Sequence, residues 1–159
     1  MFEKRKPAPP SKPKAPPLDA AKRAELFEFL KKTPYGVVST VHKDGSPESA
    51  LISLAVTPEL EVVFETLNTA RKYLNAMRDP RVAVAIGGRG DKTVQIEGLA
   101  DEPVEEDLER LKAAYYAECS FNEGHRGWPG MTYLRVKPTW IRYSNYALPW
   151  SVEEYSVPA

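Results

Sequence analysis

The chain has 159 residues, of which 42% are hydrophobic and 28% are charged, and this is the size and balance of a single globular domain. Lys plus Arg and Asp plus Glu both number 22, so the net charge is zero and predicts neither nucleic acid nor membrane partners. A single cysteine, Cys119, excludes an internal disulfide, and two distant histidines are a poor basis for a metal site.

The first 17 residues, MFEKRKPAPPSKPKAPP, differ in composition from the rest of the chain. They contain six prolines, five basic residues and one acidic residue, with almost no large apolar side chains. This composition predicts a disordered Pro/Lys-rich tail over residues 1–17 and a folded domain over residues 18–159. The tail could be a ligand for a proline-binding module, a weak anchor for polyanions or a solubilising extension. The folded part has 17 basic and 21 acidic residues, a balance of −4.

Structure is expected to begin at Asp19, a good N-cap, followed by a helix with Leu26 and Leu30 on one face. Pro34 ends this helix. The segments YGVVSTVH and ESALISLAV flank an Asp-Gly turn and predict a β-hairpin, and EVVFET predicts a third strand.

The second half of the chain predicts two more helices and three or four further strands. A helix over about 69–78 precedes strands RVAVAIGG and KTVQIEGLADE, and Pro103 is expected at the first position of the next helix, with three acidic residues in its opening turn. After a glycine-rich loop at 120–130, MTYLRVKP and TWIRYSNY predict two final strands on either side of Pro138. The predicted fold is mainly β (α+β): a six-stranded antiparallel barrel with a few flanking helices.

The start of the helix at about residue 69 has charges of the wrong sign. Arg71 and Lys72 lie in its first turn, where the helix dipole favours anions and where backbone N–H groups are unpaired. Both cations, with the hydroxyl groups of Thr66 and Thr69, could converge on a phosphate. Alternatively, the two long side chains could turn outward and pair with Glu65 or Asp79.

Standard catalytic motifs are missing from the sequence. It has no G-x-S-x-G elbow, no G-x-x-x-x-G-K-[ST] loop, no H-E-x-x-H motif and no glycine fingerprint between a strand and a helix. Cys119 and His125 are six residues apart, but no third orienting group is implied, which favours a structural thiol. No apolar run is long enough to cross a bilayer and no signal-peptide core precedes the domain, so we expect a cytoplasmic protein that is not bound to a membrane.

Three segments together resemble the flavin-binding split-barrel family typified by pyridoxamine 5′-phosphate oxidase. They are GSPESALISL, VVFETLNTARKYLNAMRDPRVAVAI and TVQIEG, in that order, and the resemblance extends over roughly residues 20–146. In that family a strand ending in Thr is followed five residues later by an Arg-Lys pair that binds the phosphate of flavin mononucleotide (FMN). Thr66, Arg71 and Lys72 match that spacing, and residues 79–82 match the strand that follows.

The resemblance implies an FMN-binding split β-barrel over residues 18–159 and a set of cofactor contacts. The strand after the Asp-Gly turn would lie along the isoalloxazine ring, Thr66 would lie near the ribityl phosphate or the ring edge, and Arg71 and Lys72 would hold the phosphate. A ring contact made by glutamine in the family falls on Thr93, with Gln95 on the same strand face as an alternative. The implied cofactor-binding residues are Ala50, Leu51, Ile52, Ser53, Thr66, Arg71, Lys72 and Thr93.

Departures from the family pattern argue against pyridoxamine-phosphate oxidation. Ala50 and Ala55 stand where the true oxidase has the Arg and Lys that meet the substrate phosphate, and its two other substrate motifs are not reproduced. Each missing charge-assisted contact is worth about 1.5–3 kcal/mol. The resemblance therefore implies an FMN-dependent oxidoreductase or reductase that acts on another small molecule or electron donor.

Family members are homodimers with the cofactor at the interface, so a homodimer is expected here, and Trp128, Trp140, Arg142 or Tyr146 are candidates to reach the partner's ring. The identity of the catalytic residues stays open. The alternatives are a reductase that uses the deazaflavin F420, a flavin carrier without its own substrate, or a non-enzymatic small-barrel binding module. Haem is disfavoured by the two histidines without a ligand context, and single-stranded nucleic acid is disfavoured by the acidic body.

Overall fold

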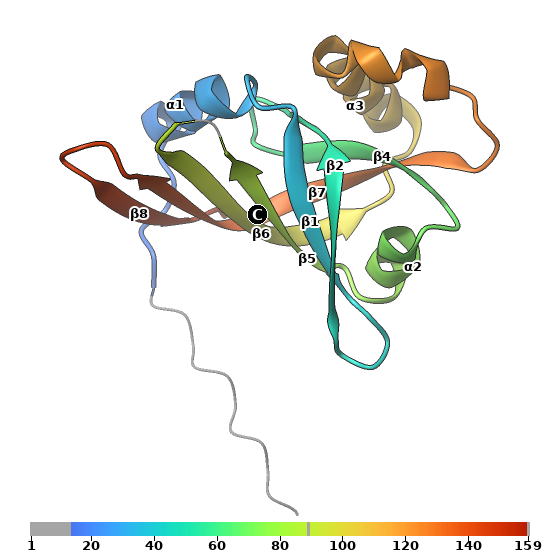
Figure 1. The fold of residues 1–159 in the computed structure, drawn as a ribbon, viewed down its shortest axis with the longest axis horizontal. Helices are drawn as coiled ribbons and strands as arrows, with labels where there is room; N and C mark the ends of the chain where they lie inside the picture. The colour runs from blue at the N-terminus through green and yellow to red at the C-terminus, as the bar shows by residue number, and fades with distance from the viewer. Residues whose placement is uncertain (1–13, 89, 159) are drawn as a thin grey trace, which may run out of the picture.

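The structure, a computed structural model, describes residues 14–88 and 90–158, and it is a strongly curled antiparallel sheet with helices around it (Figure 1). The first half contains α1 (Ala20–Leu30), β1 (Tyr35–Val41), β2 (Pro47–Ser53), β3 (Ala55–Val56), β4 (Val62–Leu67) and α2 (Arg71–Arg78). The second half contains β5 (Arg81–Gly87), β6 (Lys92–Asp101), α3 (Glu105–Glu118), the 3₁₀ helix η1 (Ser120–His125), β7 (Met131–Asn145) and β8 (Ser151–Ser156). The mainly β split-barrel prediction is confirmed.

The described strands form one sheet in the order β2-β1-β5-β6-β7-β4-β3, with β8 also paired to β7. The predicted hairpin is β1 and β2, which pair from Tyr35 opposite Ser53 to Val41 opposite Pro47. At its turn the Asp44 side chain accepts from the backbone N–H of Ser46 at 2.9 Å, and Gly45 has φ +86°, which glycine adopts without strain. β2 is an edge strand, so one side of its backbone is unpaired within the described sheet.

The predicted count of six strands is wrong, because the structure has eight strands in the part of the chain that it describes. Pro138 does not separate two strands. It lies inside β7 at a bulge, where Glu97 pairs with Trp140 but Gly98 pairs with Pro138, and the missing N–H of proline is tolerated there. A Cβ on Gly98 would overlap the Lys137 carbonyl oxygen, so this close approach requires glycine.

The two strands that were not predicted as separate strands are the short β3 and the C-terminal β8. β8 pairs with the second half of β7. On its other side β8 lies beside residues 16–18, where the Leu18 N–H donates to the Ser156 carbonyl and the Ser156 N–H donates to the Pro16 carbonyl, both at 2.9 Å. The division into a tail and a domain stays a prediction, and residues 1–13 of that tail lie outside the described residues.

The main core fills the inside of the curled sheet. Alternate residues of β1, β4, β5 and β6 point into it, and α1 adds Leu26 and Leu30, both almost fully buried. The Asp19 cap is confirmed, because its side chain accepts from the Lys22 N–H at 2.8 Å. A second, smaller core lies between α3 and the opposite face of β4 and β7, and contains Leu111 and Tyr115.

α3 begins two residues later than expected. Its first residue is Glu105 and its N-cap is Val104, so Pro103 precedes the helix, while the three acidic residues do occupy the first turn. One of them, Asp107, accepts from the buried Arg135 guanidinium at 2.8 Å, and Asp101 accepts from the same group at 2.6 Å. These contacts lower the pKa of Asp107, and for Asp101 they outweigh a burial effect of the opposite sign. The cluster ties α3 to β6 and β7.

No helix among the described residues is both long enough and apolar enough to cross a lipid bilayer.

Candidate functional site

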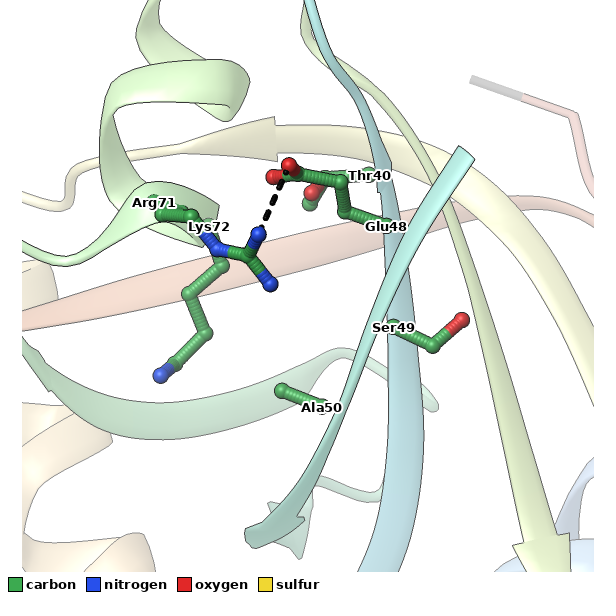
Figure 2. A pocket seen from close by; sticks show the side chains of 6 residues that line it. All are labelled: Thr40, Glu48, Ser49, Ala50, Arg71 and Lys72. Atoms are coloured by element: carbon green, nitrogen blue, oxygen red, sulfur yellow. Dashed lines mark hydrogen bonds and ion pairs between the residues drawn. The ribbon is translucent and has the colours of Figure 1, made fainter. Parts of the chain in front are cut away.

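The candidate site is a cavity of about 120 Å³ between β2 and the start of α2 (Figure 2). α2 follows β4 after a short turn and packs against β1, β2 and β6 on the core side of the sheet. This packing brings the first turn of α2 beside a hairpin that lies more than twenty residues earlier in the sequence. The lining residues are Thr40, Glu48, Ser49, Ala50, Arg71 and Lys72.

The start of α2 differs in detail from the prediction. The helix begins at Arg71 and not at about residue 69, Ala70 is its N-cap residue, and no side chain caps it. Asn68 joins the end of the glycine-rich loop, because its N–H donates to the Gly130 carbonyl at 2.8 Å. The N–H groups of Arg71 and Lys72 therefore have no side-chain capping acceptor, whereas the N–H of Tyr73 donates to the Ala70 carbonyl at 3.1 Å, and the positive end of the helix dipole lies beside the cavity.

Lys72 is a half-buried cation without a counter-charge. No hydrogen bond or ion pair joins its ammonium to another described residue, whereas Arg71 is paired. Burial without a compensating anion lowers the pKa of Lys72 from its ordinary value of 10.5. Figure 2 shows its side chain extending into the cavity, toward the side on which Ala50 lies.

Arg71 has a partner that the sequence did not suggest. Its Nη1 donates to Glu48 Oε1 at 3.1 Å, and the dashed line in Figure 2 marks this contact. Asp79, an alternative partner considered from the sequence, instead pairs with Arg81 at 2.5 Å, and Glu65 lies on the other face of β4. The Glu48 carboxylate is the anion that balances Arg71.

A buried amide holds Glu48 in place. Asn75, on α2, is 2% exposed, and its Nδ2 donates to Glu48 Oε2 at 2.8 Å and to Thr40 Oγ1 at 3.0 Å. Its Oδ1 accepts from Arg78 at 3.1 Å. The hairpin and α2 are therefore joined by a chain of polar contacts that includes two residues of the cavity lining, Thr40 and Glu48.

The predicted cofactor residues do not all gather in this cavity. Ala50, Arg71 and Lys72 line it, and Thr66 is buried at the end of β4, on the same strand face as the core residue Phe64. Strand alternation separates the β2 residues: Ile52 is buried in the core, while Leu51 is 74% exposed on the opposite face of the sheet.

The outer face of the sheet carries the remaining predicted contacts. Ser53 is on the same side of β2 as Leu51, and Thr93 lines a separate hollow with Ala85, Gly87 and Gln95. Trp140 lines another hollow on that face, and Arg142 pairs with Glu154 at 3.2 Å. Trp128 and Tyr146 are both more than half exposed. The site-residue assignment stays a prediction.

Cys119 and His125 do not form a catalytic pair. The Cys119 thiol is buried and donates to the Leu54 carbonyl oxygen at 3.4 Å, and burial raises its pKa to about 12. His125 Nδ1 lies 2.7 Å from Glu65 Oε1, and Glu65 Oε2 accepts from the Tyr116 hydroxyl at 3.2 Å. These contacts fasten the glycine-rich loop to β4 on the side away from the cavity. Among the described residues no group of three potential metal ligands exists.

The residues present fit a phosphate group in one respect and oppose it in another. An unpaired lysine ammonium and an uncapped helix start favour an anion, whereas the Glu48 carboxylate repels one. The sequence analysis did not identify Glu48, Asn75 and Thr40 as site residues, because the contact between the hairpin and α2 joins residues far apart in the sequence.

Comparison of the sequence with curated proteins gives no match. Solved structures with the same fold include a haem-binding protein from Mycobacterium smegmatis, with 17% identity and a TM-score of 0.73 over 87% of this chain and 58% of that one. They also include a putative pyridoxamine 5′-phosphate oxidase from Listeria innocua, with 22% identity and a TM-score of 0.62 over 76% of this chain and 96% of that one. General stress protein 26 from Bacillus anthracis is also similar, with 22% identity and a TM-score of 0.61 over 81% of this chain and 95% of that one.

These identities show a common fold, and this chain spans little more than half of the Mycobacterium smegmatis protein. The family assignment comes from the sequence itself, because the family described as pyridoxamine 5′-phosphate oxidase matches residues 23–145, which include every strand from β1 to β7 and the whole candidate site. The chain therefore belongs to the pyridoxamine 5′-phosphate oxidase-like split-barrel family.

Proposed function

We propose that this protein is a flavin-dependent oxidoreductase that binds the ribityl phosphate of FMN in the cavity between β2 and α2. The observation that carries this proposal is Lys72, a half-buried ammonium with no partner among the described residues, at an uncapped helix start. An unpaired charge is costly to bury, so a site that keeps one is suited to a ligand of opposite charge.

In this proposal the phosphate accepts hydrogen bonds from Lys72, from the remaining N–H groups of Arg71 and from the first turn of α2. A guanidinium has five N–H donors, and the contact with Glu48 uses one of them. Thr66, at the end of β4, is the hydroxyl-bearing residue that the resemblance to the family implies near the phosphate or the ring edge.

The isoalloxazine ring would lie along β2, where the open edge of the strand offers unpaired backbone N–H and C=O groups. Around that edge a ligand can reach both the core side of β2, at Ala50, and the outer side, at Leu51. The bound ring supplies hydride or electron transfer, and the chain supplies position and electrostatic environment.

A second copy of the chain would complete the site. The cavity of about 120 Å³ is small beside the roughly 300–1,000 Å³ of pockets that enclose drug-sized ligands. The outer face of β1, β2, β5 and β6 is uncovered in the part of the chain that the structure describes, with Leu51 and Val37 exposed and small side chains at Ala83 and Ala85. We propose a homodimer in which this exposed face, continuous with β2, packs against the same face of the partner.

The substrate is a small molecule or electron donor other than a pyridoxamine phosphate. Ala50 contributes only a methyl group to the cavity, and Ala55 is buried in the second core, so neither position offers the cation that a second phosphate needs. A buried free thiol and the lack of any disulfide among the described residues suit the reducing cytoplasm that we propose as the location.

The test is a fluorescence titration of the purified protein with FMN, riboflavin and F420, together with a visible spectrum. We expect FMN to bind and its absorption bands to shift. Changing both Arg71 and Lys72 to Ala should weaken FMN binding at least hundredfold and leave riboflavin binding almost unchanged, because riboflavin has no phosphate.

The matched control changes Lys31 and Lys32, two adjacent cations at the end of α1, to Ala. It makes the same change in net charge away from the cavity and should not alter FMN affinity. If neither FMN nor F420 binds the unmodified protein, the proposal is wrong. Binding of F420 alone would assign the deazaflavin alternative.

The dimer is tested with Ala85→Glu. This change places a charge on the exposed outer face without touching the cavity or the core. We expect a dimer for the unmodified protein in sedimentation experiments and a monomer with weakened FMN binding for the variant. A monomeric unmodified protein that binds FMN tightly would contradict this part of the proposal.

A further inference from the structure

Glu48 is a carboxylate in a site whose other charged lining residues are cations. It comes from β2, its side chain is 18% exposed, and it lines the cavity with Arg71 and Lys72. Figure 2 shows the carboxylate beside the Arg71 guanidinium, at the side of the cavity opposite Ala50. A phosphate that binds Arg71 must therefore share this guanidinium with Glu48.

We propose that Glu48 is a specificity-determining residue that competes with the ligand phosphate for Arg71 and so disfavours a doubly charged phosphate relative to a singly charged phosphodiester. This inference rests on the proposed function, because it concerns the phosphate of the flavin-type cofactor at that site. It concerns which phosphate chemistry the site prefers, which the family assignment does not determine.

Glu48 cannot simply turn away when a ligand arrives. Its second oxygen accepts from Asn75 Nδ2 at 2.8 Å, and Asn75 is itself fixed by Thr40 and Arg78. The carboxylate is thus held by α2 independently of Arg71. Moving it away would leave the buried Asn75 amide with an unsatisfied donor, which is costly.

The charged groups around the cavity come from two elements. β2 supplies Glu48, and α2 supplies Arg71, Lys72 and Arg78, of which Arg78 donates to the Val41 carbonyl and to Asn75 on the far side of that amide. The cations attract any phosphate, whatever its charge. Glu48 is the repulsive group, and its effect on a ligand scales with the charge of that ligand.

The size of the effect follows from Coulomb's law. Two groups that contact the same guanidinium lie about 6 Å apart, and at this distance a water-like dielectric gives about a threefold effect on Kd for each negative charge. Glu48 therefore weakens the affinity for a dianion about tenfold and the affinity for a monoanion about threefold. A less polar environment would enlarge both factors and keep the larger effect on the dianion.

The experiment compares Glu48→Gln with the unmodified protein at pH 8, where a phosphomonoester is a dianion. The glutamine can still accept from Asn75, so the fold is expected to persist, and an unchanged melting temperature checks this. The ligands are riboflavin, FMN and the methyl ester of FMN, which carry zero, two and one negative charges on the same ring. We expect the variant to bind FMN about tenfold tighter, the methyl ester about threefold tighter and riboflavin equally well.

The control is Glu109→Gln, an exposed carboxylate on α3 that pairs with Lys112 and makes the same change in net charge. It should leave all three affinities unchanged. Weaker FMN binding by Glu48→Gln would show that Glu48 positions Arg71 for the phosphate. Equal changes in affinity for FMN and its methyl ester would show that Glu48 does not discriminate between the two phosphate charges. Either result overturns the inference while the proposed function stands. If none of the three ligands binds the unmodified protein, the proposed flavin function fails, and the role of Glu48 fails with it.

Discussion

Replacing Lys72 with methionine is expected to move stability and ligand affinity in opposite directions. Methionine keeps the apolar stem and the approximate length of the side chain but removes the charge. Because the ammonium of Lys72 is half-buried without a partner among the described residues, its loss should raise the free energy of unfolding, by at most about 1 kcal/mol since solvent screens the exposed half.

The same substitution should weaken FMN binding by about 1.5–3 kcal/mol, the usual worth of a hydrogen bond to a charged group, which is roughly 10-fold to 150-fold in Kd. Urea unfolding of the ligand-free protein and fluorescence titration with FMN measure the two effects separately. The matched control is Lys112→Met, because Lys112 is also partly buried but pairs with Glu109 at 3.3 Å. It should not gain stability and should not affect FMN binding.

The stability gain of Lys72→Met should also depend on pH. The pKa of Lys72 is lowered in the folded protein, so between the folded value and the ordinary 10.5 the unfolded chain binds more protons, and the stability of the unmodified protein rises with pH. The difference between variant and unmodified protein should therefore shrink as the pH approaches about 10.5. A Lys72→Met variant that is less stable at neutral pH and binds FMN normally would refute the reasoning, because it would assign Lys72 a structural role.

Three other predictions concern the fold. Gly98→Ala should lower the free energy of unfolding by about 2 kcal/mol or more, because its Cβ would overlap the Lys137 carbonyl, whereas Gly124→Ala, in open space, should change urea unfolding little. Arg135→Leu should lower the free energy of unfolding by about 1–2 kcal/mol, less than for a fully buried ion pair because Asp101 and Asp107 are both more than a third exposed. Because the pKa values of Asp101 and Asp107 are lowered in the folded protein, this loss should shrink as the pH falls below about 3.8, as pH-dependent unfolding would show. Cys119 should react with a thiol reagent only when the protein is unfolded, since burial raises its pKa to about 12, and rapid labelling of the native protein would contradict this.

The local parts of the fold were predictable because their signals lie within a few residues. The Asp-Gly turn flanked by alternating apolar residues predicted the hairpin, and Asp19 predicted the start of α1. Pro138 misled the placement of strand ends, since proline usually ends a strand, and its pairing with Gly98 at a bulge lets β7 continue. That pairing joins residues forty positions apart and has no local signature.

The candidate site was half predictable for a similar reason. The spacing of Thr66, Arg71 and Lys72 is local and matches the family, so these residues were named from the sequence. Glu48 was not, because its role depends on α2 folding back onto the hairpin and on Asn75 holding the carboxylate there. Thr93 was named by family position, but it lies on the outer face of the sheet, where it lines a separate hollow with Ala85, Gly87 and Gln95.

The two cations at the start of α2 are consequently not equivalent. Arg71 is mostly exposed and already faces an anion, so its unfavourable position at the positive end of the helix is largely balanced within the chain. Lys72 is more buried and is balanced by no described residue. An incoming phosphate gains most from Lys72 and must share Arg71 with Glu48, so single substitutions should rank Lys72 above Arg71 in their effect on FMN affinity, and removing Glu48 should narrow that difference.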